Sequence, residues 1–130
     1  MKNKLRKITV NAIDYLYLVT DQYDSETKTN TLTVKVFLNG QKQTPLVIKF
    51  STVDNYIIGQ PLKSGVKLFN KIKNTEEEVN LNEPKYIKEL IILGLKDGWS
   101  GTNLIAIQNG LDYLSELGFQ TDQLKPEYNE

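Results

Sequence analysis

Two alternating apolar runs joined by an Asn-Gly pair constrain the fold of this chain more than any other feature. In residues 31–38 every second side chain is a large aliphatic one, namely Leu32, Val34, Val36 and Leu38. Residues 46–51 repeat this period with Leu46, Ile48 and Phe50. Asn39-Gly40 lies between the runs, and both residues accept the positive φ angles of a hairpin turn. The pattern predicts two antiparallel strands with a shared apolar face, joined by a loop that extends to Thr44 or Pro45.

The N-terminal part of the chain predicts further strands of the same sheet. Residues 5–10 and 13–20 are rich in strand-forming residues, and Asn11-Ala12 between them is interpreted as a turn. The second of these runs has two apolar faces, with Tyr15 and Tyr17 on one and Leu16 and Leu18 on the other. A strand of this kind is expected inside the sheet or covered on both sides. The polar residues 21–30 are interpreted as an exposed hairpin loop.

The middle of the chain is less regular. Glycines and a proline interrupt residues 52–65, which are interpreted as an irregular crossing. Residues 66–72 fit either a strand or a helix. A strand is favoured because Gly65 precedes them and a second alternating run follows near residues 77–81. Residues 104–107 likewise fit either an extended segment or the first turn of a final helix.

Residues 84–97 have the apolar period of an amphipathic helix, whose stripe contains Tyr86, Ile87, Leu90, Ile91 and Leu95. Asn82 is the expected N-cap, and Pro84 suits the first turn because its missing amide is not needed there. Gly98 is expected to end the helix in a left-handed conformation. Gly94 disfavours a helix by ~1 kcal/mol relative to alanine. We therefore expect it to allow close approach of the helix to a strand.

A second helix is predicted from Gln108 or Asn109 through Leu117. Its apolar face contains Leu111, Leu114 and Leu117. Gly118 suits the position after the helix, and Phe119 is placed to pack back on the last turn as in a Schellman motif.

Together these elements predict an α+β fold. It contains an antiparallel meander sheet of about four to six strands, with two C-terminal helices packed on one face. A chain of 130 residues suggests one domain. Residues 1–119 are expected to form that domain, and the polar residues 120–130 to form a loosely ordered tail.

The chain contains no cysteine and no histidine. This excludes disulfides, thiolate nucleophiles and imidazole general bases, and neither a metal nor another cofactor is expected. Sixteen basic and sixteen acidic side chains argue against a nucleic-acid-binding protein. No apolar stretch has the length of a signal peptide or a membrane span, so a cytoplasmic location without membrane contact is expected.

Carboxylates remain as candidate catalytic groups. Asp14 is interpreted as a surface residue of a strand, with a partly buried acid of raised pKa as the alternative. The consecutive carboxylates Glu76, Glu77 and Glu78 point in different directions on a strand and are interpreted as a charged edge. A metal-dependent hydrolase would require Asp14, Asp112 and a glutamate to converge in space. The sequence has no phosphate loop or nucleophile elbow, and no catalytic residue is assigned.

Trp99 lies in a glycine-flanked turn after the central helix, where it either seals the core or faces a partner. With Tyr15 and Tyr17 it forms the candidate contact for a partner or ligand. We therefore predict a small, soluble, non-enzymatic binding protein that acts stoichiometrically on another protein, as immunity and accessory proteins do, or on a second copy of itself. The alternative is a small-ligand-binding module, with these aromatic residues lining a pocket between sheet and helices.

Overall fold

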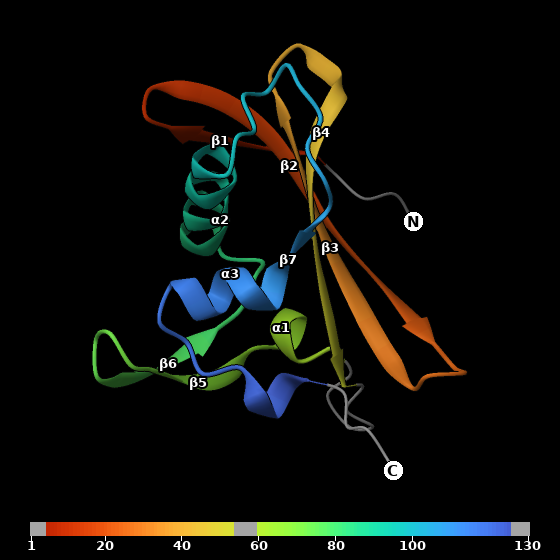
Figure 1. Cartoon of the computed structure of the whole chain (residues 1–130), viewed down its shortest axis with the longest axis vertical. Helices are drawn as coiled ribbons and strands as arrows, with labels where there is room; N and C mark the ends of the chain where they lie inside the picture. Colours follow the sequence, from red (N-terminus) through yellow and green to blue (C-terminus); the bar gives the residue numbers. More distant parts are fainter. Residues whose placement is uncertain (1–4, 54–59, 126–130) are drawn as a thin grey trace.

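A five-stranded sheet forms the frame of the molecule (Figure 1). The computed structural model describes residues 5–53 and 60–125, and the structural statements below concern those residues. Four strands follow one another as an antiparallel meander: β1 (Arg6–Val10), β2 (Ile13–Asp24), β3 (Thr29–Leu38) and β4 (Gln41–Val53). The short β7 (Gln108–Asn109) pairs with β4 in parallel, which gives the order β1-β2-β3-β4-β7.

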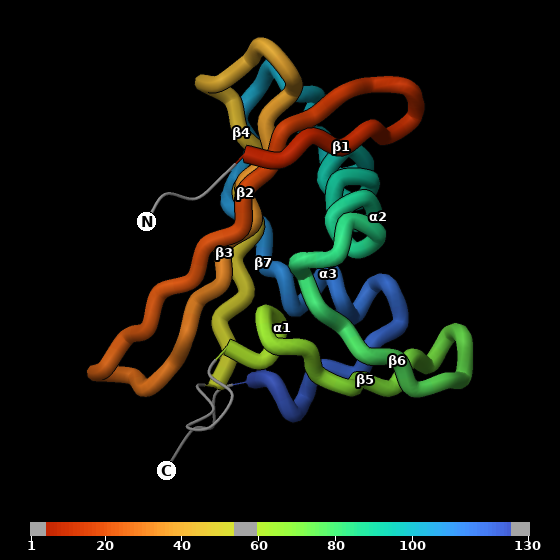
Figure 2. Tube along the Cα trace, turned by 180° about the vertical axis from the view of Figure 1, so that it is seen from behind, coloured from red at the N-terminus to blue at the C-terminus, as the bar shows by residue number. Residues whose placement is uncertain are grey.

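The remaining elements lie on one side of this sheet in both views (Figures 1 and 2). They are the helices α1 (Pro61–Ser64), α2 (Pro84–Lys96) and α3 (Gly110–Glu116), the two-stranded sheet of β5 (Val66–Asn70) and β6 (Thr75–Val79), and the 3-10 helix η1 (Asp122–Leu124). The predicted α+β class is thus confirmed. The strand favoured for residues 66–72 is present as β5, and the run near residues 77–81 begins earlier, as β6.

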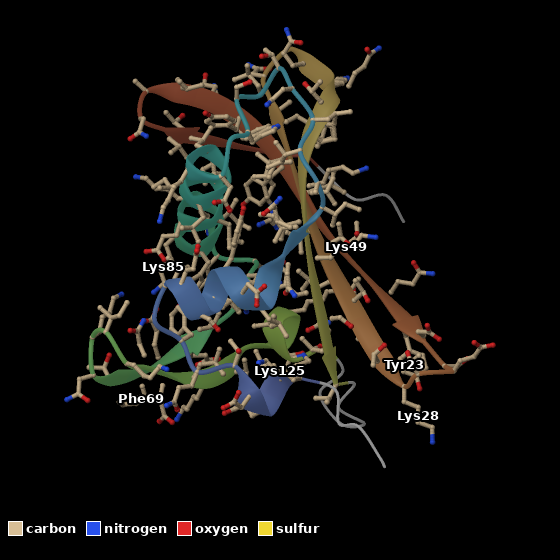
Figure 3. All side chains as sticks on the ribbon, viewed as in Figure 1. Tyr23, Lys28, Lys49, Phe69, Lys85 and Lys125 are labelled. Carbon is tan, nitrogen blue, oxygen red and sulfur yellow. The ribbon has the colours of Figure 1, made fainter. Side chains whose placement is uncertain are left out.

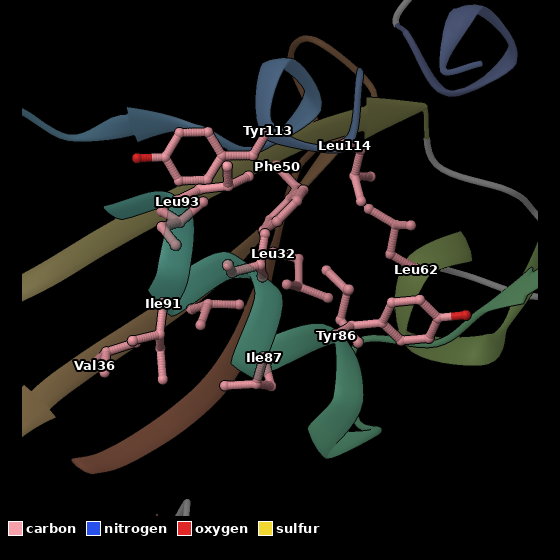
Figure 4. Close-up of a cluster of buried hydrophobic side chains, with 14 of the residues drawn as sticks. Leu32, Val36, Phe50, Leu62, Tyr86, Ile87, Ile91, Leu93, Tyr113 and Leu114 are labelled. Atoms are coloured by element: carbon pink, nitrogen blue, oxygen red, sulfur yellow. The ribbon is translucent and has the colours of Figure 1, made fainter. Parts of the chain in front are cut away.

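The core lies between the inner face of the sheet and the helices (Figure 4). The inner residues of β3 and β4 are fully buried, namely Leu32, Val34, Val36, Leu46, Ile48 and Phe50. From the other side, α2 contributes Ile87, Leu90 and Ile91, and α3 contributes Leu114. The apolar faces that result from a period of 2.0 in the strands and of 3.6 in the helix therefore pack against each other.

Two glycines bring the helices against β4. A Cβ atom added to Gly94 of α2 would lie 2.4 Å from Cδ2 of Leu46. One added to Gly110, at the start of α3, would lie 2.3 Å from Cδ2 of Phe50. The close approach expected at Gly94 is confirmed, and α3 approaches β4 in the same way.

Both main helices end in Schellman motifs. In α2, the Trp99 amide donates to the Gly94 carbonyl at 3.0 Å and the Gly98 amide to Leu95 at 3.2 Å, with Gly98 at φ +110°. In α3, the Phe119 amide donates to Leu114 and the Gly118 amide to Ser115, each at 3.0 Å. The predicted C-terminal ends are therefore confirmed.

An asparagine side chain caps one of the two main helices, and the N-cap predicted for the other is wrong. The side chain of Asn109 accepts from the amides of Leu111 and Asp112 at the start of α3. The cap of α2 is Glu83, without a side-chain hydrogen bond. Asn82 instead donates its side-chain amide to the carbonyl of Lys63, because α1 packs beside this end of α2.

The sheet extends further than the apolar runs indicate. The predicted loop at residues 21–30 is mostly strand, and only residues 25–28 form the turn between β2 and β3. Asp24 stabilises that turn by accepting from the amides of Glu26 and Thr27. β4 begins at Gln41, so the loop predicted to reach Thr44 or Pro45 is only the pair Asn39-Gly40. In these stretches the strands continue because cross-strand hydrogen bonds form, and not because side chains are buried.

The packed structure also continues beyond the predicted domain boundary at residue 119. The Gln120 amide donates to the carbonyl of Phe69 at 2.9 Å, which places this segment beside β5. Thr121 and Leu124 are buried at 3% and 1% exposure. Residues 120–125 thus pack against the rest of the fold, and residues 126–130 lie outside the described part. The division into a domain of residues 1–119 and a loosely ordered tail stays a prediction. Residues 54–59 of the crossing predicted at residues 52–65 also lie outside the described part, whereas residues 52 and 53 belong to β4 and residues 61–64 form α1.

Candidate functional site

The three aromatic residues predicted to contact a partner lie in the core. Tyr15, Tyr17 and Trp99 are each 2% exposed. The Trp99 indole donates to the carbonyl of Thr44 at 2.9 Å, and its ring lies 5.8 Å from that of Tyr15. In this conformation Trp99 seals the core between the end of α2 and β4, and none of the three offers a partner its side-chain surface. Their role in binding stays a prediction, so a candidate site has to be built from other residues.

We expect the single tryptophan to report this burial directly. Native Trp99 should emit at short wavelength and be shielded from iodide, because its ring is packed and its N–H is hydrogen-bonded. Guanidinium unfolding should shift the emission to longer wavelength and restore quenching. Native emission that already resembles that of free indole would show that the Trp99 turn is open in solution.

The carboxylates singled out by sequence do not form a site. Asp14 accepts from the Thr9 hydroxyl at 2.7 Å and lies 3.4 Å from Lys7 Nζ. The hydrogen bond from Thr9 and the charge of Lys7 lower the pKa of Asp14, so the alternative of a raised pKa is wrong. Among the described residues, no group of three or more acidic side chains could hold a metal ion. The convergence required for a metal-dependent hydrolase is therefore not found there.

The charged strand β6 has a structural role at one position. Glu77 accepts from the Tyr86 hydroxyl and lies near Lys73 and Lys85, at 3.7 and 3.8 Å. Burial, followed by the hydrogen bond to Glu77, raises the pKa of Tyr86. Glu77 therefore connects the sheet of β5 and β6 to the start of α2. Glu76 and Glu78 are exposed, as a charged edge would be.

The outer surface of the main sheet is the stronger candidate. Neither α2 nor α3 covers it (Figures 1 and 2). Its side chains alternate with the buried ones along each strand. We define the open face as Leu16, Leu18 and Thr20 of β2, Thr33, Lys35 and Phe37 of β3, Val47 and Lys49 of β4, and Ile107 before β7. The strand register sets Leu16 opposite Phe37 and Lys35 opposite Val47. Half-buried apolar side chains therefore lie on β2, β3 and β4 of this face, with Lys35 between those of β2 and β4.

The open face is hollowed, and the hollows meet at Lys49. One concavity of about 390 Å³ lies between the apolar side chains and includes Leu18, Val47 and Ile107. A second, of about 710 Å³, runs along the threonine-rich part of β2 and β3 towards their turn. A third, of about 520 Å³, lies between β4 and α3. Lys49 lines all of these, and Figure 3 labels it beside β4.

The chemical groups of this surface are suited to contact. Leu16, Leu18, Phe37 and Val47 are partly exposed, and Ile107 is 59% exposed. Thr20 and Thr33 add hydroxyl groups, and Lys35 and Lys49 add positive charge. The sequence contained one signal for this surface, the apolar outer positions Leu16 and Leu18. We expected such a strand to be central or covered; it is central, but no described element covers its outer side.

Comparison with known proteins adds no relative. No protein-family model, no curated protein and no solved structure matches the chain. In the described part of the chain, no helix is long and apolar enough to cross a membrane.

Proposed function

We propose that this protein binds another protein stoichiometrically through the open face, in the manner of an immunity or accessory protein. The observation that carries the proposal is the set of partly exposed apolar side chains around hollows that meet at Lys49. A cytoplasmic location is part of the proposal, since a chain without cysteine has no disulfides that require an oxidising compartment.

The distribution of side chains supports a contact surface. An antiparallel sheet with one face in water commonly alternates apolar and polar residues, which leaves the solvent face polar. Here the outer positions of β2 and β3 include Leu16, Leu18 and Phe37. A contiguous apolar patch rimmed by polar residues is typical of protein interaction sites. The neighbouring threonines supply part of such a rim, while Lys35 lies between Leu18 and Val47 within the patch.

A pair of identical substitutions tests this proposal. Ile107→Glu places a carboxylate in the apolar part of the open face, and Ile72→Glu makes the same change in the turn after β5. These isoleucines are 59% and 73% exposed, so both variants should fold. We expect Ile107→Glu to weaken capture of the partner from the lysate of the source organism about tenfold or more, because a charge would be buried at the interface.

Ile72→Glu should capture the same protein as the unmodified chain does. Titration of that protein should then give a one-to-one ratio. Equal capture by Ile107→Glu, or no specific capture by the unmodified chain, would contradict the proposed function.

A further inference from the structure

Two lysines lie beside each other at the centre of the open face. The register places Lys35 opposite Val47 and Lys49 opposite Thr33, so the two lysines are diagonal neighbours on β3 and β4. Diagonal neighbours in an antiparallel pair are roughly 7 Å apart. Within residues 5–53 and 60–125, neither ammonium group forms a hydrogen bond or an ion pair.

Within the described part of the chain, the acidic residues around this surface form no ion pair with Lys35 or Lys49. Asp14 is held by Thr9 and Lys7 beyond one end of the face. Asp24 accepts backbone amides in the turn beyond the other end. Asp112 borders the concavity between β4 and α3, but it forms no ion pair with Lys49 among the described residues. Asp21, Asp24 and Glu26 line the same hollow as Lys49, but no carboxylate of the described residues forms an ion pair with either lysine.

Resting on the proposed function, we infer that the partner is a protein with an acidic contact surface, whose carboxylates face Lys35 and Lys49 beside apolar side chains. Carboxylates there would relieve the repulsion between the two ammonium groups and steer association. The apolar neighbours Leu18, Val47 and Ile107 would exclude water from these ion pairs, which would strengthen them.

Two other occupants fit this surface less well. A second copy of the chain, related by a twofold axis through the centre of the face, would bring four lysines together. A nucleic acid would find Phe37 as the one aromatic side chain of the open face, on a chain whose basic and acidic residues balance at sixteen each. Nucleic-acid surfaces combine a larger basic area with several stacking aromatic residues.

Zero-length crosslinking tests the inference. A water-soluble carbodiimide joins a lysine amine to a carboxylate in direct contact, with loss of water. In the lysate of the source organism, we expect amide bonds between Lys35 or Lys49 and aspartate or glutamate of the captured protein, located by peptide mapping. The variant Lys35→Arg/Lys49→Arg keeps the charge without a reactive amine, so it should bind within about twofold and lose the crosslinks.

Charge reversal supplies the second readout. Lys35→Glu/Lys49→Glu should lower the affinity for the captured protein about tenfold or more at low salt, with an unchanged melting temperature. If capture depends on Ile107 but the crosslinks involve neither lysine, or if charge reversal leaves the affinity unchanged, the inference of an acidic partner is wrong. The proposed function then still stands.

Other outcomes are equally decisive. Capture of a second copy of this chain or of an oligonucleotide through the same face would overturn the acidic protein partner. Failure of the unmodified chain to capture any protein in an Ile107-dependent manner would remove the proposed function, and this inference with it.

Discussion

Gly94→Leu is expected to lower the melting temperature by roughly 10 °C, through a loss of about 3 kcal/mol in the free energy of unfolding. A Cβ atom alone would lie 2.4 Å from Leu46 Cδ2, and Leu46 is fully buried. A leucine adds three further carbon atoms at this contact, so α2 has to move away from β4. Leucine favours a helix over glycine by under ~1 kcal/mol, which is too little to offset the overlap. Thermal unfolding followed by circular dichroism measures the change.

A double-mutant cycle with Leu46 tests the cause of that loss. Leu46→Ala alone should cost about 2–5 kcal/mol, because it leaves a cavity beside Gly94. In Gly94→Leu/Leu46→Ala the new leucine can occupy this space, so the combined loss should be smaller than the sum of the single losses. Ile92→Leu, at a position of α2 that is 42% exposed, serves as the control with little change. Additive losses, or an unchanged melting temperature for Gly94→Leu, would contradict close packing at this position.

The elements with strong local signals could be predicted from the sequence. The helix α2 has an apolar period, Pro84 in its first turn and Gly98 after its end, and each of these acts within a few residues. The hairpin turn Asn39-Gly40 and the Schellman end at Gly118 are equally local. These predictions are confirmed because local conformational preference and tertiary packing agree.

The features that the sequence did not reveal depend on distant partners. The polar residues 21–24 become strand because β3 pairs with them, and Gln120 is held by the carbonyl of Phe69. Asn82 does not cap α2 because its side chain bonds to Lys63, nineteen positions earlier. Hydrogen bonds between residues that are far apart in the sequence leave no periodic pattern in it.

The candidate site was missed for a related reason. Aromatic residues attract attention as contact residues, but Tyr15, Tyr17 and Trp99 have the size and polar tips that also suit the edge of a core. The open face consists of ordinary Leu, Val, Thr and Lys side chains. Leu18 and Val47 are partly exposed neighbours of Lys35 because the helices pack on the other side of the sheet. The sequence alone does not show which side the helices cover.

The separation of the two sheet faces leads to the prediction with the largest effect. Ile48→Asp should abolish the cooperative unfolding transition, because Ile48 is fully buried against the helices. An aspartate there would lose the packing of the isoleucine and bury a carboxylate without a partner. Together these exceed roughly 5 kcal/mol, which is comparable to the whole stability of a small domain. Near-ultraviolet circular dichroism and thermal unfolding would show the loss.

Val47→Asp is the matched control, because it makes a similar change one residue earlier on the outer side of β4. Val47 is partly exposed and lies opposite Lys35, so this variant should keep its cooperative transition within about 2 kcal/mol of the unmodified chain. A folded Ile48→Asp variant would mean that the core face of β4 is misassigned. If Val47→Asp folds but no longer binds the captured protein, adjacent residues of one strand separate stability from binding. Such a result would mean that the inner side of the sheet stabilises the fold and the outer side binds the partner.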